Sequence, residues 1–243
     1  MAIVRYDGSF EGLLSIVYAS YYERFIPERI TTEESSGLFD TVRRIETDEE
    51  KAVKVLDAFY QKVGHKAART LYLGHLGACQ EEQIACYHFV RLGFSHPEAI
   101  QNPTIHCVRT VEGIRRKVLS EAHRMLGFIR FQKVSGGFYY APFEPTYPVL
   151  SLVAGHFTKR FGSQPFILHD TLRAQALIHN DKESRIVTVT AADLPEVSDD
   201  ENHYQQLWRS FFDTVAIRSR ENPALQKHFV PLKYRNWMTE FSP

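Results

Sequence analysis

Apolar positions along the chain change their spacing near residue 128. Before that point they recur every three or four residues, as on one face of a helix, from Leu13 and again from Val111. After that point, short apolar runs alternate with turn residues, which is typical of β-strands. The pattern therefore predicts a mostly helical first half and a strand-rich second half.

The chain is predicted to open with a strand at 2–6 and a helix that ends before Pro27. Ser9 stands where that helix begins, so we expect its hydroxyl to cap the helix. A helix N-terminus also favours anions, which leaves anion binding as a second interpretation of Ser9. Residues 28–50, with eight acids and three bases, are predicted to form a loosely structured connection.

Helical spacing then continues through residues 47–102, with breaks expected at Gly64, Gly77 and Gly93. A further helix is predicted over 108–126, with Gly127 as its C-terminal cap. The second half holds a hairpin with a glycine-rich turn, further strands and closing helices. These elements are predicted at 128–134 and 138–143 (hairpin), 148–161 (helix), 166–169, 174–179 and 185–190 (strands), and 204–218 and 223–229 (helices).

Together these elements predict an α+β fold that forms a single domain over residues 1–243. An antiparallel β-sheet, built from the second half plus the N-terminal strand, would be flanked by helices. The all-helical stretch 47–102 would then be an insert within that domain.

Composition excludes several classes of protein. The chain has 29 basic and 29 acidic residues, which argues against wholesale non-specific binding of nucleic acid. Three cysteines without paired spacing do not suggest a secreted disulfide framework. Neither a signal peptide nor an apolar stretch long enough to span a membrane is visible, so the predicted location is the cytoplasm.

Sequence motifs for metal or cofactor binding are missing. His75, Cys79 and Cys86 lie near one another, but they lack the paired spacing of a zinc site and are predicted to be structural. No CxxxCxxC triad is present to hold an iron–sulfur cluster. Walker A, GxGxxG and GxSxG motifs are absent as well. We therefore predict neither a metal site nor a cofactor.

Titratable side chains nevertheless provide candidates for general acid or base catalysis, because histidine and carboxyl groups transfer protons near neutral pH. For each of them a structural or surface role is the more common alternative. The catalytic candidates are Glu121, His123, Glu144 and His169.

Positive charge is concentrated in residues 109–133, which hold seven bases and two acids. Arginine clasps phosphate with two parallel hydrogen bonds, and aromatic rings stack on bases. The alternative is a solvated helix face beside core aromatics, and the sequence does not separate the two. The predicted nucleic-acid-binding residues are Arg109, Arg116, Arg124, Arg130, Phe128 and Tyr140.

Several short motifs also carry a resemblance to a known family. The most recognisable are YDGSFEGLL at 6–14 and EAHRMLGFIRF at 121–131, followed by FEP at 143–145, HF at 156–157, HD at 169–170 and LWR at 207–209. In this order and spacing they resemble a bacterial family described as probable DNA-metabolism proteins. The resemblance extends over nearly the whole chain and is weakest in 28–50 and in the helical stretch.

The resemblance implies a role in DNA metabolism beside a radical-SAM DNA modification or repair protein. Related domains also occur fused to uracil-DNA-glycosylase-like proteins. The expected function is thus a DNA-binding component of a repair or modification system that acts with that partner. One alternative is a DNA-acting hydrolase or glycosylase-like enzyme that uses Glu121 and His123. The other is a protein-interaction subunit with no DNA affinity of its own.

Overall fold

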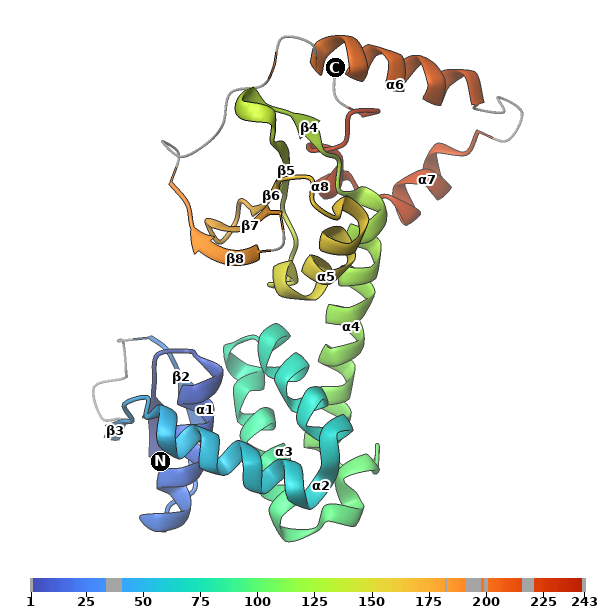
Figure 1. Cartoon of the computed structure of the whole chain (residues 1–243). Helices are drawn as coiled ribbons and strands as arrows, with labels where there is room; N and C mark the ends of the chain where they lie inside the picture. Colours follow the sequence, from blue (N-terminus) through green and yellow to red (C-terminus); the bar gives the residue numbers. More distant parts are fainter. Residues whose placement is uncertain are drawn as a thin grey trace. The chain divides into compact units, whose positions relative to one another are not determined.

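A computed structural model of the chain describes residues 2–33, 41–181, 183–190, 198, 201–215 and 221–241 (Figure 1). They form two compact units, residues 1–119 and residues 120–243, called the first and second unit below. Helix α4 (His106–Phe128) runs from the first unit into the second, so Gly127 lies inside the helix instead of capping it. The predicted mixture of helices and sheets is confirmed.

The sheet of the first unit is parallel and has three strands. β1 (Ala2–Arg5) lies between β2 (Arg29–Thr31) and β3 (Thr41–Arg44). Val4 pairs with Ile30 on one side and with Arg43 on the other. The prediction that the N-terminal strand joins an antiparallel sheet with the second half is therefore wrong. So is the loose connection predicted for 28–50, because both edge strands fall within it.

Helix α1 (Phe10–Tyr22) begins where the sequence predicts. The Ser9 hydroxyl accepts the N–H of Gly12 at 2.9 Å, so its capping role is confirmed. Asp7 accepts both the N–H and the hydroxyl of Ser9, at 2.9 and 2.6 Å, and the hydroxyl of Thr47 at 2.7 Å. These bonds tie the turn after β1 to the segment that precedes α2, and the pKa of Asp7 is lowered because they outweigh its desolvation.

The helices predicted in 47–102 are present as α2 (Glu49–Gly77), η1 (Gln80–Glu82), α3 (Gln83–Ser95) and η2 (Pro97–Gln101). Gly64 interrupts α2 with φ of 81°. A Cβ at Gly93 would lie 2.4 Å from the ring of Phe59, so this glycine lets α3 approach α2 closely. That these helices are an insert stays a prediction.

The second unit has a mixed five-stranded sheet in the order β4-β5-β6-β7-β8. Its strands are β4 (Gln132–Lys133), β5 (Tyr139–Phe143), β6 (Phe166–Asp170), β7 (Gln175–Asn180) and β8 (Glu183–Thr188). Helix α5 (Leu150–Phe161) connects β5 to β6, and such a crossover makes that pair parallel. The other neighbouring pairs are antiparallel, so the predicted antiparallel sheet is only partly right.

The predicted hairpin is confirmed as β4 and β5, joined through η3 (Ser135–Gly137), in which Gly136 and Gly137 both have φ of 80°. The chain continues with α6 (Glu201–Val215), α7 (Pro223–Phe229) and α8 (Leu232–Arg235). The predicted range of α7 is confirmed. Helix α6 begins three residues before its predicted start, and its predicted end at 218 lies outside the described residues.

Candidate functional site

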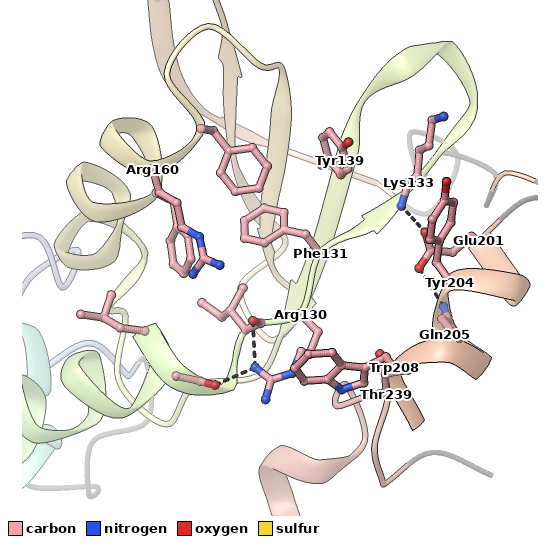
Figure 2. Close-up of a pocket in the computed structure, with 15 residues that line it drawn as sticks. Arg130, Phe131, Lys133, Tyr139, Arg160, Glu201, Tyr204, Gln205, Trp208 and Thr239 are labelled. Atoms are coloured by element: carbon pink, nitrogen blue, oxygen red, sulfur yellow. Dashed lines mark hydrogen bonds between the residues drawn. The ribbon is translucent and has the colours of Figure 1, made fainter. Parts of the chain in front are cut away.

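A pocket in the second unit encloses about 680 Å³. This volume falls within the roughly 300–1,000 Å³ of ordinary ligand sites. Its walls come from the end of α4, from α5, from strands β4 and β5, from α6 and from the segment near Thr239 (Figure 2). We call it the aromatic pocket, because its lining includes Phe131, Tyr139, Phe157, Phe161, Tyr204 and Trp208.

Its floor is a cluster of packed rings. The ring centroid of Phe131 lies 4.5 Å from that of Phe161 and 5.2 Å from that of Phe157. Tyr139 meets Phe161 edge to face at 5.6 Å. Because aromatic rings in such mutual contact have few alternative rotamers, the floor is rigid and presents a fixed apolar surface.

Trp208 and Arg130 stand at the pocket together, oriented by one buried carboxylate. Glu240 accepts hydrogen bonds from the Arg130 guanidinium at 2.6 and 3.2 Å and from the Trp208 indole N–H at 3.2 Å. Burial opposes ionisation of Glu240, but the hydrogen bonds that it accepts, together with the positive charge of Arg130, outweigh burial and lower its pKa. The guanidinium lies 5.7 Å from the centre of the Trp208 ring system, a cation–π distance.

The remaining donors of Arg130 also face protein oxygens. Its Nη1 donates to the carbonyl of Gly127 at 2.6 Å and to that of Ile129 at 3.3 Å. Arginine has five N–H donors, so these bonds leave little capacity for a phosphate. In this geometry the guanidinium of Arg130 orients the Trp208 ring more than it offers charge to a ligand.

Two further cations line the pocket without such restraint. Lys133 and Arg160 are exposed, and neither forms an ion pair with any residue that the structure describes. Glu201, the acid of the lining, accepts the backbone N–H of Lys133 at 2.7 Å and a bond from Gln205 at 3.3 Å. In Figure 2, Arg160 lies on one side of Phe131, and Tyr204 and Trp208 lie on the other.

The structure gives the sequence-predicted nucleic-acid-binding residues different local surroundings. Arg130 lines the aromatic pocket, whereas Phe128 packs on Tyr234 with centroids 5.5 Å apart. Arg124 lies against the same ring at 5.9 Å, and its buried Nε has no hydrogen-bond partner. Tyr140 is buried in the sheet. Arg109 and Arg116 belong to the first unit, where both line a different pocket.

Glu121, a catalytic candidate, is only 1% exposed. Its carboxylate accepts the backbone N–H groups of Thr146 and Tyr147, at 2.8 and 2.7 Å, and the hydroxyl of Tyr234. The ammonium of Lys233 lies 3.8 Å away. Burial favours the neutral acid, but the hydrogen bonds prevail and lower the pKa of Glu121. The ionised group thus fixes the loop after β5.

His169 and Tyr140 form a buried pair, with the tyrosine oxygen 2.7 Å from Nδ1 of the histidine. Burial lowers the pKa of His169 and raises that of Tyr140, so both groups are neutral near pH 7. Neither lines a pocket described here. The geometry therefore gives the pair a packing role in the sheet.

The other two catalytic candidates have different contacts. His123 is exposed on α4, two positions from the buried Glu121, a spacing that directs helical side chains to different faces. Glu144 is half-buried and accepts a hydrogen bond from the Thr171 hydroxyl at 3.3 Å. Among the described residues, no hydrogen bond or ion pair joins any two of the four candidates.

The sulfur and imidazole groups of the first unit are also dispersed. Nδ1 of His75 lies 2.9 Å from the side-chain oxygen of Gln83, and burial lowers the pKa of this histidine. Cys86 is buried, whereas Cys79 is exposed. Within the described ranges, no three His, Cys, Asp or Glu side chains converge as metal ligands would.

Within the same described ranges, no helix has both the length and the apolarity needed to cross a membrane.

Sequence reasoning missed several residues of the aromatic pocket: Tyr204, Trp208, Arg160 and the orienting Glu240. One signal was available, because Tyr204 and Trp208 are four apart and therefore face the same way on a helix. Glu240 gave none, since it meets Arg130 across 110 positions of sequence.

A family model described as a domain of unknown function, DUF4130, matches residues 80–240, about two thirds of the chain. The chain therefore belongs to this family, whose description states no activity. The match includes every residue that lines the aromatic pocket. No curated protein matches the sequence.

Proposed function

We propose that this member of the DUF4130 family is a nucleic-acid-binding component of a DNA repair or modification system. Its second unit would bind unpaired nucleotides in the aromatic pocket. The observation that carries the proposal is the pairing of an oriented, 40% exposed Trp208 with two unrestrained cations around one pocket. The resemblance of the sequence motifs to DNA-metabolism proteins supports DNA as the nucleic acid.

The rings and the cations of the aromatic pocket match the bases and the phosphates of single-stranded nucleic acid. An unpaired base exposes its faces, so it stacks on Trp208 or Tyr204 at about 1–3 kcal/mol per base. Lys133 and Arg160 would meet the adjoining phosphates, for which long cationic side chains are suited. Duplex DNA hides the faces of its bases, so this geometry favours single strands or an extruded base.

The hydrolase or glycosylase-like alternative has weaker support. A general acid or base must reach the substrate through a pocket, and it needs a pKa near the working pH. Glu121 directs its carboxylate to the protein and has a lowered pKa, while His123 faces elsewhere. Binding therefore explains more of the geometry than hydrolysis does.

The protein-interaction alternative is favoured by another observation, the apolar face of α6. Leu207, Phe211 and Val215 are each more than half exposed, on the helix that also carries Trp208. Contiguous exposed apolar side chains commonly mark a protein interface. The resemblance suggests a radical-SAM protein as the partner, and Leu207 and Phe211 would contact it without lining the aromatic pocket.

The test is fluorescence anisotropy of the full chain with labelled oligothymidylate and with a duplex of equal length, at low salt. We expect the single strand to bind more tightly. Trp208→Ala should weaken its binding about 5- to 150-fold, corresponding to the loss of one stacked base. Phe229→Ala is the matched control, an exposed aromatic of α7 outside the pocket, and should bind as the wild type does.

The two tryptophans of the chain allow a direct check of stacking. In Trp237→Phe, emission comes from Trp208 alone and should be quenched when the oligonucleotide binds. If the wild type binds no single strand at low salt, or if Trp208→Ala binds equally well, the proposal is wrong. Co-purification of the radical-SAM partner that Leu207→Gln and Phe211→Gln abolish would instead support the interaction subunit.

A further inference from the structure

A second pocket, in the first unit, combines an apolar floor with a cationic rim. It encloses about 360 Å³ and is bordered by α2, α3, η2 and the first turns of α4. Phe89, Ile100 and Val108 form part of the floor, and Lys66, Arg109 and Arg116 stand at the exposed rim. We call it the cationic pocket.

Its lining carries more positive than negative charge. Glu112 is the acid of the lining, and its carboxylate accepts a hydrogen bond of 2.7 Å from Arg115, a residue outside the pocket. Among the described residues, Lys66, Arg109 and Arg116 form no ion pair. Arg116 uses only its Nε, which donates to the backbone carbonyl of Glu112 at 3.4 Å. Its two terminal nitrogens form no hydrogen bond with any described residue and are therefore available to a ligand.

We propose that the cationic pocket binds a small phosphate monoester whose body is an aromatic ring, such as a nucleotide. The proposal does not depend on the aromatic pocket, because all of its residues lie in the first unit. Arg109 and Arg116 would bind this ligand, which is separate from the single-stranded nucleic acid proposed to bind the second unit.

The charge and shape of the pocket both favour this chemistry. A phosphate monoester carries about −1.5 to −2 charges at pH 7 and has three acceptor oxygens, so it matches three cations better than a carboxylate does. Two of those cations are arginines, which bind phosphate with paired hydrogen bonds. The floor lies beside the rim, so an apolar ring joined to the phosphate would cover it, and a bare phosphate would not.

The first experiment is calorimetric titration of the full chain with adenosine 5′-monophosphate, adenosine and inorganic phosphate at low salt. We expect the nucleotide to bind at least about tenfold more tightly than either fragment, because only the nucleotide engages both the floor and the rim. Arg109→Ala and Arg116→Ala should each weaken its binding about tenfold, through the loss of charge-assisted hydrogen bonds.

Three variants locate the binding. Lys117→Ala removes an exposed cation of the same helix that does not line the pocket, and it should leave binding unchanged. Gln101→Trp adds bulk at an exposed position of the rim and should block the ring without removing a charge. Trp208→Ala alters only the aromatic pocket and should have no effect.

The results either support or overturn the cationic pocket. Weakening by the arginine variants and by Gln101→Trp, with Lys117→Ala and Trp208→Ala unchanged, supports it. No binding of the nucleotide by the wild type overturns it. Equal weakening by Lys117→Ala overturns it too, since the attraction is then diffuse. Weakening by Trp208→Ala alone assigns the nucleotide to the aromatic pocket and overturns the proposal while leaving the proposed function intact.

The same variants distinguish a free nucleotide from the phosphorylated end of a strand. In the Trp208→Ala background, a 5′-phosphorylated oligonucleotide and its 5′-hydroxyl form compete against adenosine 5′-monophosphate. Competition by the phosphorylated form alone supports the site and identifies a strand end as its source. Competition by neither form, with the nucleotide still bound, supports a site for free nucleotides.

Discussion

Two positively charged side chains of the second unit are held in the opposite way to two of the first unit. In the second unit, Arg130 is bound to Glu240, and Arg173 to the fully buried Asp170 at 2.9 Å and to the carbonyl of Pro145 at 3.1 Å. In the first unit, Lys66 and Arg109 project from exposed helix surfaces without an ion pair among the described residues.

The difference separates two uses of charge. A guanidinium whose donors are taken up by buried carboxylates and carbonyls supports the fold and orients its neighbours, as Arg130 does for Trp208. An exposed cation contributes little to stability and retains its charge for a ligand. Removal of the anchoring groups should therefore harm stability, and removal of the free cations should harm binding alone.

The largest effect is expected for Glu121→Gln. This change leaves the donors of Thr146, Tyr147 and Tyr234 facing an amide that accepts through one oxygen, and each unsatisfied buried donor costs about 1–3 kcal/mol. We expect the free energy of unfolding of the second unit to fall by about 3 kcal/mol. Urea unfolding followed by tryptophan emission measures it, because both tryptophans lie in that unit.

The control is Glu112→Gln, which removes the carboxylate of a half-buried ion pair with Arg115 on α4, in the first unit. Ion pairs one turn apart on a helix surface contribute roughly 0.3–0.5 kcal/mol. Equal losses in the two variants would contradict the structural role of Glu121 and restore it as a catalytic candidate.

The sequence predicted the long elements of the fold well, because apolar periodicity reports helices and longer strands directly. It missed β2 and β3, whose burial against β1 depends on residues that carry no local pattern: Ile30 is the single apolar residue of β2. Strand direction was missed for a similar reason. Helix α5 was predicted between two strands, but its role as the crossover between neighbours exists only in the folded sheet.

At the candidate site, too, the sequence revealed local patterns but not tertiary contacts. Arg130 was found because basic residues cluster locally along 109–133. Trp208 and Glu240 were not, because they meet Arg130 only through tertiary contacts. Glu121 attracted attention as a titratable group near a histidine, yet sequence cannot reveal that backbone N–H groups of a distant loop occupy its oxygens.

A smaller effect, with a defined pH dependence, is expected for Glu240→Gln. The folded-state pKa of Glu240 is lowered, so its stabilising effect is present above the unfolded value of about 4.3 and is lost as pH falls through the folded value. We expect the variant to lose about 1.5 kcal/mol at pH 7, as for a charge-assisted hydrogen bond, and less as the pH falls below 4.

The measurement is urea unfolding of wild type and variant at pH 7, 5, 4 and 3. A difference that stays constant over this range would show that Glu240 is not ionised in its contact with Arg130. Oligonucleotide binding at pH 7 should also weaken in the variant, because Trp208 and Arg130 lose the group that orients them.

A still smaller effect concerns the salt dependence of single-strand binding. Lys133→Ala and Arg160→Ala should each make the slope of log affinity against log salt shallower by about 0.7, the value for one phosphate contact on a single strand. Lys159→Ala, an exposed neighbour of Arg160 that does not line the aromatic pocket, is the control. If the slope is the same in all three variants, Lys133 and Arg160 do not contact phosphates.

The smallest expected effect is the loss of stability on removing an exposed cation of the first unit. Arg109→Ala should change the free energy of unfolding by no more than about 0.5 kcal/mol, because the side chain is exposed and forms no ion pair with a described residue. Arg173→Ala should be clearly more destabilising, since it leaves the buried carboxylate of Asp170 without its ion pair. Thermal unfolding of both variants measures the contrast. If Arg109→Ala destabilises the protein as much as Arg173→Ala does, then Arg109 is a structural residue, and the cationic pocket loses one of the groups proposed to hold its phosphate.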